Sequence, residues 1–154
     1  MRQPSVLRHT THDVHHRHRA SGTQRNLSAE IPGRTPWRVL VVESDAHAAR
    51  GIAQRLRRQG CDVVSVDSGS KALSMYECAD LVLLDLELAD LDGLDVCAAI
   101  RAAGDTPIIA FTRRRSNMDQ VLVLEAGADD CLMKPYDLRE LTARIGRASC
   151  RERV

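Results

Sequence analysis

Residues 81–93 read LVLLDLELADLDG, and this stretch decides the fold. Four apolar residues followed directly by the carboxylate of Asp85 are typical of a buried strand that ends at the polar edge of a sheet. Three more acids, Glu87, Asp90 and Asp92, follow closely. They form either an ordinary solvated loop or a site for a cation or a phosphoryl group. For Asp90 and Asp92, the helical pattern that follows favours a role at the start of the next helix, where negative charge is favourable.

The alternation of short apolar runs and helical stripes continues along the chain. The runs are too short for buried helices and predict strands at 38–42, 62–66, 80–85, 106–111 and 130–133. Apolar residues at helical spacing predict helices at 46–60, 68–78, 92–103 and 116–126, and a fifth from residue 137 onward. This order predicts an α/β protein with a flavodoxin-like, five-stranded parallel sheet and helices on both faces.

Composition places this sheet in one domain without an export or membrane segment. The 154 residues are 44% hydrophobic and 28% charged, which is typical of a globular domain. No apolar run approaches the roughly 20 residues of a membrane span, and the first residues lack the apolar segment of a secretory signal. The five cysteines are scattered singly, which suits neither a zinc site nor a disulfide framework. We therefore expect a cytoplasmic protein with reduced thiols.

Charge is unevenly distributed along the chain. Residues 1–35 carry six Arg and two acids, residues 36–144 carry 13 basic and 18 acidic residues, and the last ten carry three Arg and one Glu. The first part is polar and aperiodic, so we predict that residues 1–36 form a disordered basic leader. Residues 37–144 then form an acidic domain, which is a poor nucleic-acid binder by itself.

Chemically active side chains follow four of the predicted strands. Parallel strands end at one edge of a sheet, so these side chains should meet there: Glu43, Ser44 and Asp45, then Asp85 and Glu87, then Thr112, then Lys134. Carboxylate oxygens suit Mg²⁺, and Asp85 suits a nucleophile for phosphorus. The Lys134 ammonium and the Thr112 hydroxyl suit phosphate oxygens. Each residue alone is more simply a solvated charge or a strand residue, and only the combination predicts a site for a phosphoryl group.

Four blocks of the sequence resemble the signature blocks of bacterial two-component response-regulator receiver domains. They are LVVESD (40–45), DLVLLDLELADLDGLDV (80–96), TPIIAFT (106–112) and EAGADDCLMKPYDLRELTARI (125–145). The resemblance covers residues 38–145, in order and at the family's spacing. It implies a (βα)5 receiver domain that takes a phosphoryl group from a sensor histidine kinase and is not an enzyme.

The resemblance also implies a role for each residue at the edge. The implied phosphoacceptor is Asp85. The implied switch and phosphate-binding residues are Thr112 and Lys134, with a cis peptide bond before Pro135. The implied Mg²⁺ ligands are Glu43, Asp85 and the backbone carbonyl of Glu87, and the further position, Ser44 or Asp45, stays open.

Four positions depart from the family pattern. They are Ser44 in place of the second acid of a pair, Ala89 in place of a proline, Cys131 in place of an aromatic switch residue, and Arg113 in place of a small residue. A hydroxyl is a weaker Mg²⁺ ligand than a carboxylate. The alternative function is therefore a phosphate-independent pseudo-receiver that acts as a protein-interaction module. A phosphatase of related architecture would need a second acid beside Asp85, for which Glu87 is the nearby candidate.

The block GADDCLMKPYDLREL, residues 127–141, is most similar to winged-helix transcription factors of the OmpR/PhoB type. This similarity implies that phosphorylated receivers form a homodimer through charged residues. The candidates are Asp129, Asp130, Arg139 and Arg144, for which ordinary surface charge is the alternative. It also implies control of transcription through a DNA-binding domain that is absent from this chain.

The last ten residues, IGRASCRERV, match one reading frame of a common sequencing adapter at all ten codons. The alternative is a genuine basic tail. We predict that residues 145–154 are a non-native tail, and that the natural protein continues into the DNA-binding domain.

Overall fold

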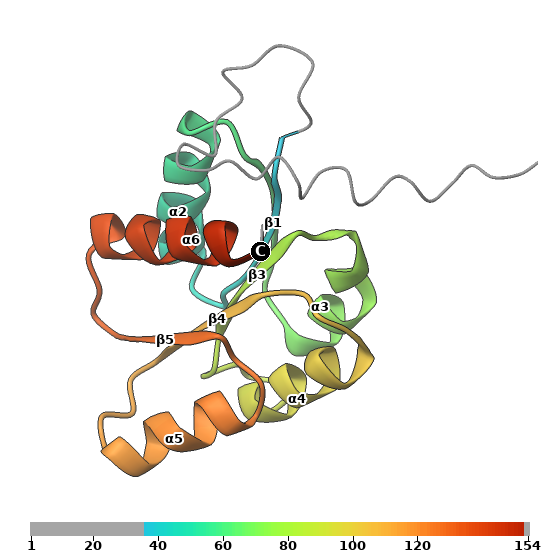
Figure 1. Cartoon of the computed structure of the whole chain (residues 1–154), viewed down its shortest axis with the longest axis vertical. Coiled ribbons are helices and arrows are strands. Elements are labelled where there is room, and N and C mark those ends of the chain that lie inside the picture. Colours follow the sequence, from blue (N-terminus) through green and yellow to red (C-terminus); the bar gives the residue numbers. More distant parts are fainter. Residues whose placement is uncertain (1–35, 153–154) are drawn as a thin grey trace, which may run out of the picture.

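The structure, a computed structural model, describes residues 36–152 (Figure 1). Its centre is a five-stranded parallel sheet in the order β2-β1-β3-β4-β5. The strands are β1 (Arg38–Val42), β2 (Asp62–Val66), β3 (Leu81–Asp85), β4 (Ile108–Thr112) and β5 (Asp130–Met133). The strand order changes direction between β1 and β3, and in such sheets ligands bind outside the carboxyl ends of the strands at this point.

Four helices connect the consecutive strands, and a fifth follows β5. They are α2 (Ala46–Arg58), α3 (Gly69–Met75), α4 (Gly93–Ala103), α5 (Asn117–Glu125) and α6 (Leu138–Glu152), with a 3₁₀ turn η1 (Tyr76–Cys78) after α3. Four helices begin at a polar side chain that accepts a backbone N–H of the first turn: Asp45, Ser68, Asp92 and Ser116. Such caps satisfy donors that the helix itself leaves unpaired, which is why the helices begin at these residues.

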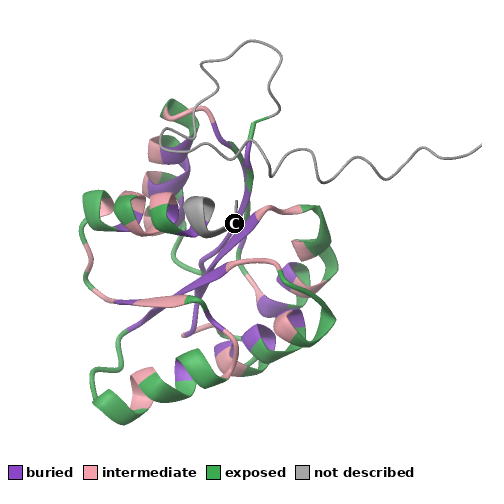
Figure 2. Cartoon of the chain, viewed as in Figure 1, coloured by how far each residue is buried: buried purple, intermediate pink, exposed green. Residues whose placement is uncertain are grey.

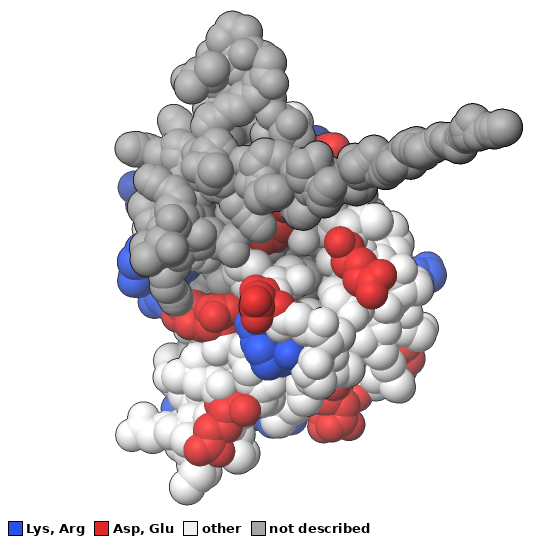
Figure 3. Space-filling view, turned by 45° about the vertical axis from the view of Figure 1, so that its right-hand side comes forward, with Lys and Arg blue, Asp and Glu red and all other residues white. Residues whose placement is uncertain are grey.

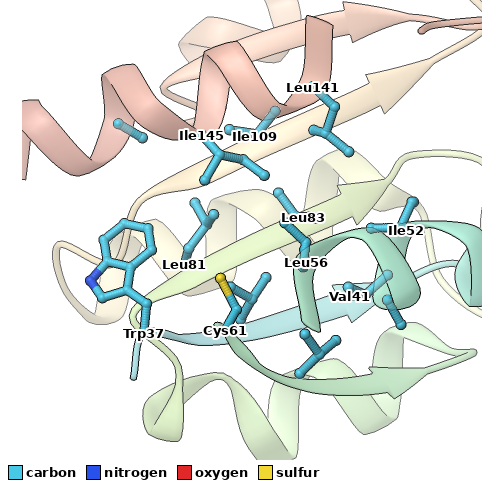
Figure 4. Close-up of a cluster of buried hydrophobic side chains, with 14 of the residues drawn as sticks. Trp37, Val41, Ile52, Leu56, Cys61, Leu81, Leu83, Ile109, Leu141 and Ile145 are labelled. Atoms are coloured by element: carbon cyan, nitrogen blue, oxygen red, sulfur yellow. The ribbon is translucent and has the colours of Figure 1, made fainter. Parts of the chain in front are cut away.

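One face of the sheet packs against α2 and α6 (Figure 4). Val41 of β1 and Leu83 of β3 form one buried cluster with Ile52 and Leu56 of α2 and with Ile145 of α6. Each of these side chains is almost fully buried, and burying one of this size stabilises a fold by about 2 kcal/mol. This cluster fixes α2 and α6 over the strands that lead to the polar edge.

The opposite face packs against α3, α4 and α5. Leu84 of β3 and Ala110 of β4 lie in a second buried cluster with Val96 and Ile100 of α4. The strands are therefore covered on both sides, while the outer surfaces of the helices are exposed (Figure 2). All five residues of β3 are buried, so the strand delivers Asp85 to the sheet edge from inside the core.

The predicted fold is confirmed, with most element ends within two residues of the prediction and larger changes in one helix. The predicted strand 106–111 is shifted, because parallel pairing with β3 begins at Ile108 and pairing with β5 extends to Thr112. Pro107, which has no N–H, contributes only its carbonyl. Thr112 is consequently the last residue of β4. The predicted helix 68–78 ends at Met75 and tightens into η1.

The two ends of the chain bear on the predicted domain limits. Residues 1–35, nearly all of the predicted leader, lie outside the described residues. α6 runs past residue 144 to Glu152, and Ile145 and Ala148 are buried in the first cluster. The predicted tail thus begins inside a helix, and its non-native origin stays a prediction. Within residues 36–152, no helix has the length and apolar character needed to cross a bilayer.

Candidate functional site

The predicted edge residues come together at the carboxyl ends of β1, β3, β4 and β5. The register pairs Val42 with Leu84, the residues that directly precede Glu43 and Asp85, and Lys134 directly follows β5. Within the described residues, the buried polar side chains are those of Glu43, Asp85 and Thr112, with exposed fractions of 3%, 1% and 0%. Because buried polar groups are rare unless they have partners, this edge is a polar site and not an ordinary solvated loop.

Lys134 is the cation of the site and faces three carboxylates. Its Nζ lies 2.8 Å from Asp85 Oδ1, 3.9 Å from Glu43 Oε1 and 3.7 Å from Glu87 Oε1. The backbone N–H of Glu87 also donates to Asp85 Oδ1, at 3.0 Å. One ammonium among three acids leaves an excess of negative charge, which a proton or a metal cation can balance. The Lys134–Pro135 peptide bond is cis.

Glu43 is the acid that responds to this excess. Its Oε2 accepts the backbone N–H of Asp45 at 3.1 Å. Burial, and next the hydrogen bond with the Asp85 carboxylate, raise the pKa of Glu43 from 4.5 to about 7. Near neutral pH this carboxyl therefore exchanges its proton readily, and a cation bound beside the two acids would displace it.

Thr112 and Glu87 form the other half of the site. The Thr112 hydroxyl donates to Glu87 Oε2 at 3.1 Å and accepts the backbone N–H of Arg114 at 2.9 Å. The backbone N–H of Arg113 donates to both Glu87 oxygens, at 3.2 Å and 3.3 Å. Arg113 thus meets the site through its backbone. The Glu87 carboxylate thus accepts hydrogen bonds from Thr112 and Arg113. The family resemblance assigns a role to its backbone carbonyl instead, and that role stays a prediction.

Ser44 and Asp45, the two candidates for the open metal position, have different surroundings. Asp45 Oδ1 accepts the backbone N–H groups of His47 and Ala48, at 3.0 Å and 3.4 Å, so this side chain caps α2. Ser44 is exposed and carries only a hydroxyl. Neither residue puts a second buried carboxylate beside Glu43.

The donor set fits Mg²⁺ held by few protein groups. Mg²⁺ binds oxygen ligands, commonly takes one or two carboxylates, and keeps several waters. Glu43 and Asp85 supply two neighbouring buried carboxylates whose repulsion a dication would relieve. Across residues 36–152, no three acidic, histidine or cysteine side chains gather into a ready-made metal cage. The carboxylate pair is therefore the part of the site that suits the ion.

Asp90 supports the loop that leaves the site. Its two oxygens accept the backbone N–H groups of Gly69 and Ser70, at 2.8 Å and 3.0 Å, and these bonds lower its pKa. Asp90 therefore ties the loop to the start of α3. The expectation that it begins the next helix is wrong, whereas Asp92 does cap α4. The partner of Asp90 is set by the packing of two segments that are distant in the sequence, so residue spacing does not predict it.

Gly93 holds the other end of the same loop. A Cβ at this position would overlap the Leu86 backbone, lying 2.6 Å from its carbonyl oxygen. Glycine therefore lets α4 begin directly against the residue that follows Asp85. The contact is not among the sequence predictions, although a glycine between a cap residue and a helical stripe is a signal for it.

The aromatic and thiol groups near the site lie on different strands. Tyr136 stacks on Phe111, the residue before Thr112, with ring centroids 4.9 Å apart, and burial raises the pKa of the tyrosine. Cys131 is half-buried, and burial raises the pKa of its thiol as well. A pocket of about 320 Å³ borders Cys131 and includes Arg115 in its lining. A thiol thus lines the pocket at the family's usual aromatic position, and the ring pair joins β4 to the segment that follows β5.

The four residues predicted for a dimer face have partners in their own chain. The pairs are Asp129 Oδ2 with Arg101 Nη2 at 2.9 Å and with the Ile108 N–H at 2.8 Å, Asp130 Oδ1 with Arg144 Nη1 at 2.7 Å, and Arg139 Nη2 with Asp137 Oδ2 at 3.3 Å. The sequence does not predict the contact between Arg101 and Asp129. All these side chains are at least partly exposed, so surface charge remains the alternative and the dimer face stays a prediction.

Charged side chains form separate groups on one side of the molecule (Figure 3). Among the described residues in view, several acidic groups are divided by wide uncharged areas, and basic side chains lie at the left margin and beside the central acidic group. The acidic groups agree with the acidic character that the sequence predicts for residues 37–144.

Comparisons with known proteins agree with this geometry. A family model described as "Response regulator receiver domain" matches residues 39–146. The sensory transduction protein RegX3 of Mycolicibacterium smegmatis is 46% identical over 109 residues, which are 70% of this chain and 48% of RegX3. The DNA-binding response regulator MtrA of Mycobacterium leprae is 43% identical over 110 residues, 70% of this chain and 49% of MtrA. The chain spans about half the length of these relatives.

The likeness extends to a solved structure. The BeF3-activated N-terminal receiver domain of Klebsiella pneumoniae RstA is 33% identical, with a TM-score of 0.69. The match covers 73% of this chain and 97% of that domain. The similarity therefore concerns the fold as well as the sequence.

Proposed function

The chain belongs to the response regulator receiver domain family, and on this premise we propose that Asp85 is its phosphoacceptor, served by a sensor histidine kinase. A receiver domain is not an enzyme. The observation that carries the proposal is the contact of 2.8 Å between Lys134 Nζ and Asp85 Oδ1 at a buried sheet edge. An ammonium beside a carboxylate nucleophile neutralises the charge of an incoming phosphoryl group.

The residues around Asp85 have separate tasks in this reaction. Lys134 and the Glu87 N–H hold Asp85 Oδ1, which orients the carboxylate for in-line attack on phosphorus. The new O–P bond forms while the bond from phosphorus to the donor breaks, and the leaving group keeps the electron pair of that bond. Lys134 and the Thr112 hydroxyl then stabilise the phosphoryl oxygens.

We assign Mg²⁺ binding to Glu43, Asp85 and the backbone carbonyl of Glu87, with Ser44 or Asp45 at the remaining position. The ion would neutralise charge on the phosphoryl oxygens. The raised pKa of Glu43 supports this assignment, because it marks a place where a second negative charge needs a cation.

We further propose that the domain controls transcription from the cytoplasm. MtrA is by name a DNA-binding response regulator and is about twice as long as the matched region. A DNA-binding domain outside this chain would act when two phosphorylated receivers pair. The proposed pairing residues are Asp129, Asp130, Arg139 and Arg144.

Phosphorylation is tested by incubation with acetyl phosphate and Mg²⁺, followed by intact-mass measurement. We expect the wild type to gain one phosphoryl group and Asp85→Asn to gain none. Asp62→Asn is the matched control, because Asp62 is an exposed acid at the opposite edge of the sheet, and it should behave as the wild type. An equal gain in Asp85→Asn would contradict the proposal.

The alternative is a pseudo-receiver that binds partners without phosphate, and the exposed hydroxyl of Ser44 favours it. Ser44→Asp restores the family's second acid and separates the two functions. If the wild type takes up no phosphate and Ser44→Asp does, the natural domain is a pseudo-receiver. If both are phosphorylated, the faster rate of Ser44→Asp measures what the missing acid costs.

A further inference from the structure

The Glu87 carboxylate lies across the groups that would receive a phosphoryl group. Its Oε2 is 3.1 Å from Thr112 Oγ1, its oxygens are 3.2 Å and 3.3 Å from the Arg113 backbone nitrogen, and its Oε1 is 3.7 Å from Lys134 Nζ. A hydroxyl, an amide and an ammonium thus converge on one anion. These donors are already satisfied before any phosphate arrives.

The same donors surround Asp85. Lys134 Nζ contacts Asp85 Oδ1 at 2.8 Å and also faces Glu87, so the two carboxylates share one ammonium. Phosphoryl oxygens and carboxylate oxygens compete for donors of this kind, because both form charge-assisted hydrogen bonds. The oxygens of a phosphoryl group on Asp85 would therefore compete with the Glu87 carboxylate for the same hydrogen-bond donors.

We propose that Glu87 is a positioning residue whose carboxylate substitutes for the phosphoryl oxygens in the unphosphorylated domain. It holds Thr112 and the Arg113 N–H in an anion-bound arrangement, and it must leave when Asp85 is phosphorylated. This inference rests on the proposed function of Asp85. Its consequences are slower phosphorylation and a smaller rearrangement of Thr112 on phosphorylation.

Two effects set the size of the barrier that Glu87 adds. Displacing an acceptor of charge-assisted hydrogen bonds costs about tenfold in an equilibrium constant. Repulsion between the Glu87 charge and the phosphoryl group also slows phosphorylation. The Glu87 side chain is 33% exposed, so it can turn to solvent when it is displaced. Removing the carboxylate should therefore accelerate phosphorylation about tenfold.

The test uses Glu87→Met, which removes the carboxylate but keeps an unbranched side chain, and Glu87→Gln, which keeps one acceptor oxygen. Glu77→Met is the matched control, because Glu77 is exposed and precedes β3 at the opposite edge of the sheet. Circular dichroism establishes that each variant is folded. Partial exposure of Glu87 makes these substitutions tolerable for the core.

The first measurement needs no phosphate and concerns the hydrogen bond itself. Amide hydrogen exchange at Arg113, followed by NMR, should become about tenfold faster in Glu87→Met because its acceptor is gone. Glu87→Gln should lie between Glu87→Met and the wild type, and Glu77→Met should match the wild type. Unchanged exchange in Glu87→Met would overturn the inference.

The second measurement is the rate of phosphorylation by acetyl phosphate at saturating Mg²⁺. We expect Glu87→Met to react about tenfold faster than the wild type and Glu77→Met to react at the wild-type rate. Equal rates in the wild type and Glu87→Met would overturn the competition and leave the proposed function intact. Absence of phosphorylation in every variant would overturn the proposed function, and the competition with it.

Discussion

The polar edge at β1 and β3 and the surface over β5 and α6 use the same kinds of residues with different results. At the edge, the side chains of Lys134 and Asp85 are 13% and 2% exposed. On the surface, those of Arg144 and Asp130 are 24% and 29% exposed. Burial makes each charge at the edge depend on its neighbours, whereas water screens charges on the surface. Reactivity is therefore expected where desolvation forces acids to share a cation or a proton.

The largest effect on the free energy of unfolding should come from removing the Glu43 carboxylate from the polar edge. The folded pKa of Glu43, about 7, exceeds the ordinary value of 4.5, so the folded domain binds this proton more tightly than the unfolded chain. Stability should therefore fall as pH rises from 4.5 to 7 and stay low above that. Glu43→Gln should raise the free energy of unfolding at pH 8 by about 3 kcal/mol and have little effect at pH 4.5.

Urea unfolding of the wild type and Glu43→Gln across this pH range measures the difference. Glu140→Gln is a suitable control, because Glu140 lies on the surface and pairs with Arg144. A pH-independent difference for Glu43→Gln would show that burial does not raise the pKa of this acid.

A second effect should come from the backbone contact behind Asp85. Gly93→Ala forces its new Cβ into the Leu86 backbone, and such overpacking typically costs about 2 kcal/mol. Gly51→Ala is the matched control, because nothing lies within 4 Å of a Cβ there and alanine favours the helix by about 1 kcal/mol. Thermal unfolding should show opposite shifts for the two variants. Equal shifts would mean that the start of α4 does not support the edge.

A third effect concerns the metal. Mg²⁺ binding requires the ionised form of Glu43, so the apparent affinity should weaken as pH falls below about 7. The expected loss is about tenfold per pH unit between pH 6.5 and 5.5. Calorimetric titration with MgCl₂ measures it. In Glu43→Gln, the Mg²⁺ affinity should be low and its pH dependence largely lost. If the pH dependence is retained in this variant, a group other than Glu43 causes it.

The smallest effect should be found on the surface. The Asp130–Arg144 pair is partly exposed, so its coupling should be about 0.5 kcal/mol and should weaken in high salt. A double-mutant cycle with Asp130→Asn and Arg144→Met, followed by urea unfolding, measures this coupling. A coupling energy of several kcal/mol would contradict the expected difference between the buried edge and the exposed surface.

The sequence predicts the parts of the molecule that depend on periodicity and topology. Apolar runs and capping residues define the strands and helices, and parallel order alone brings Asp85, Thr112 and Lys134 to one edge. The family resemblance drawn from the same blocks is confirmed. What escapes prediction are contacts between distant segments, such as Asp90 on the start of α3 and Arg101 on Asp129. The pKa of Glu43 likewise depends on burial that spacing does not reveal.

The central claim is that Asp85 itself carries the phosphoryl group. Borohydride reduces an acyl phosphate to an alcohol, so reduction after treatment with acetyl phosphate and Mg²⁺ marks the modified residue. Peptide mapping by mass spectrometry should then find homoserine at position 85. Labelling at Glu43, Glu87 or another acid, or no labelling at all, would contradict the claim.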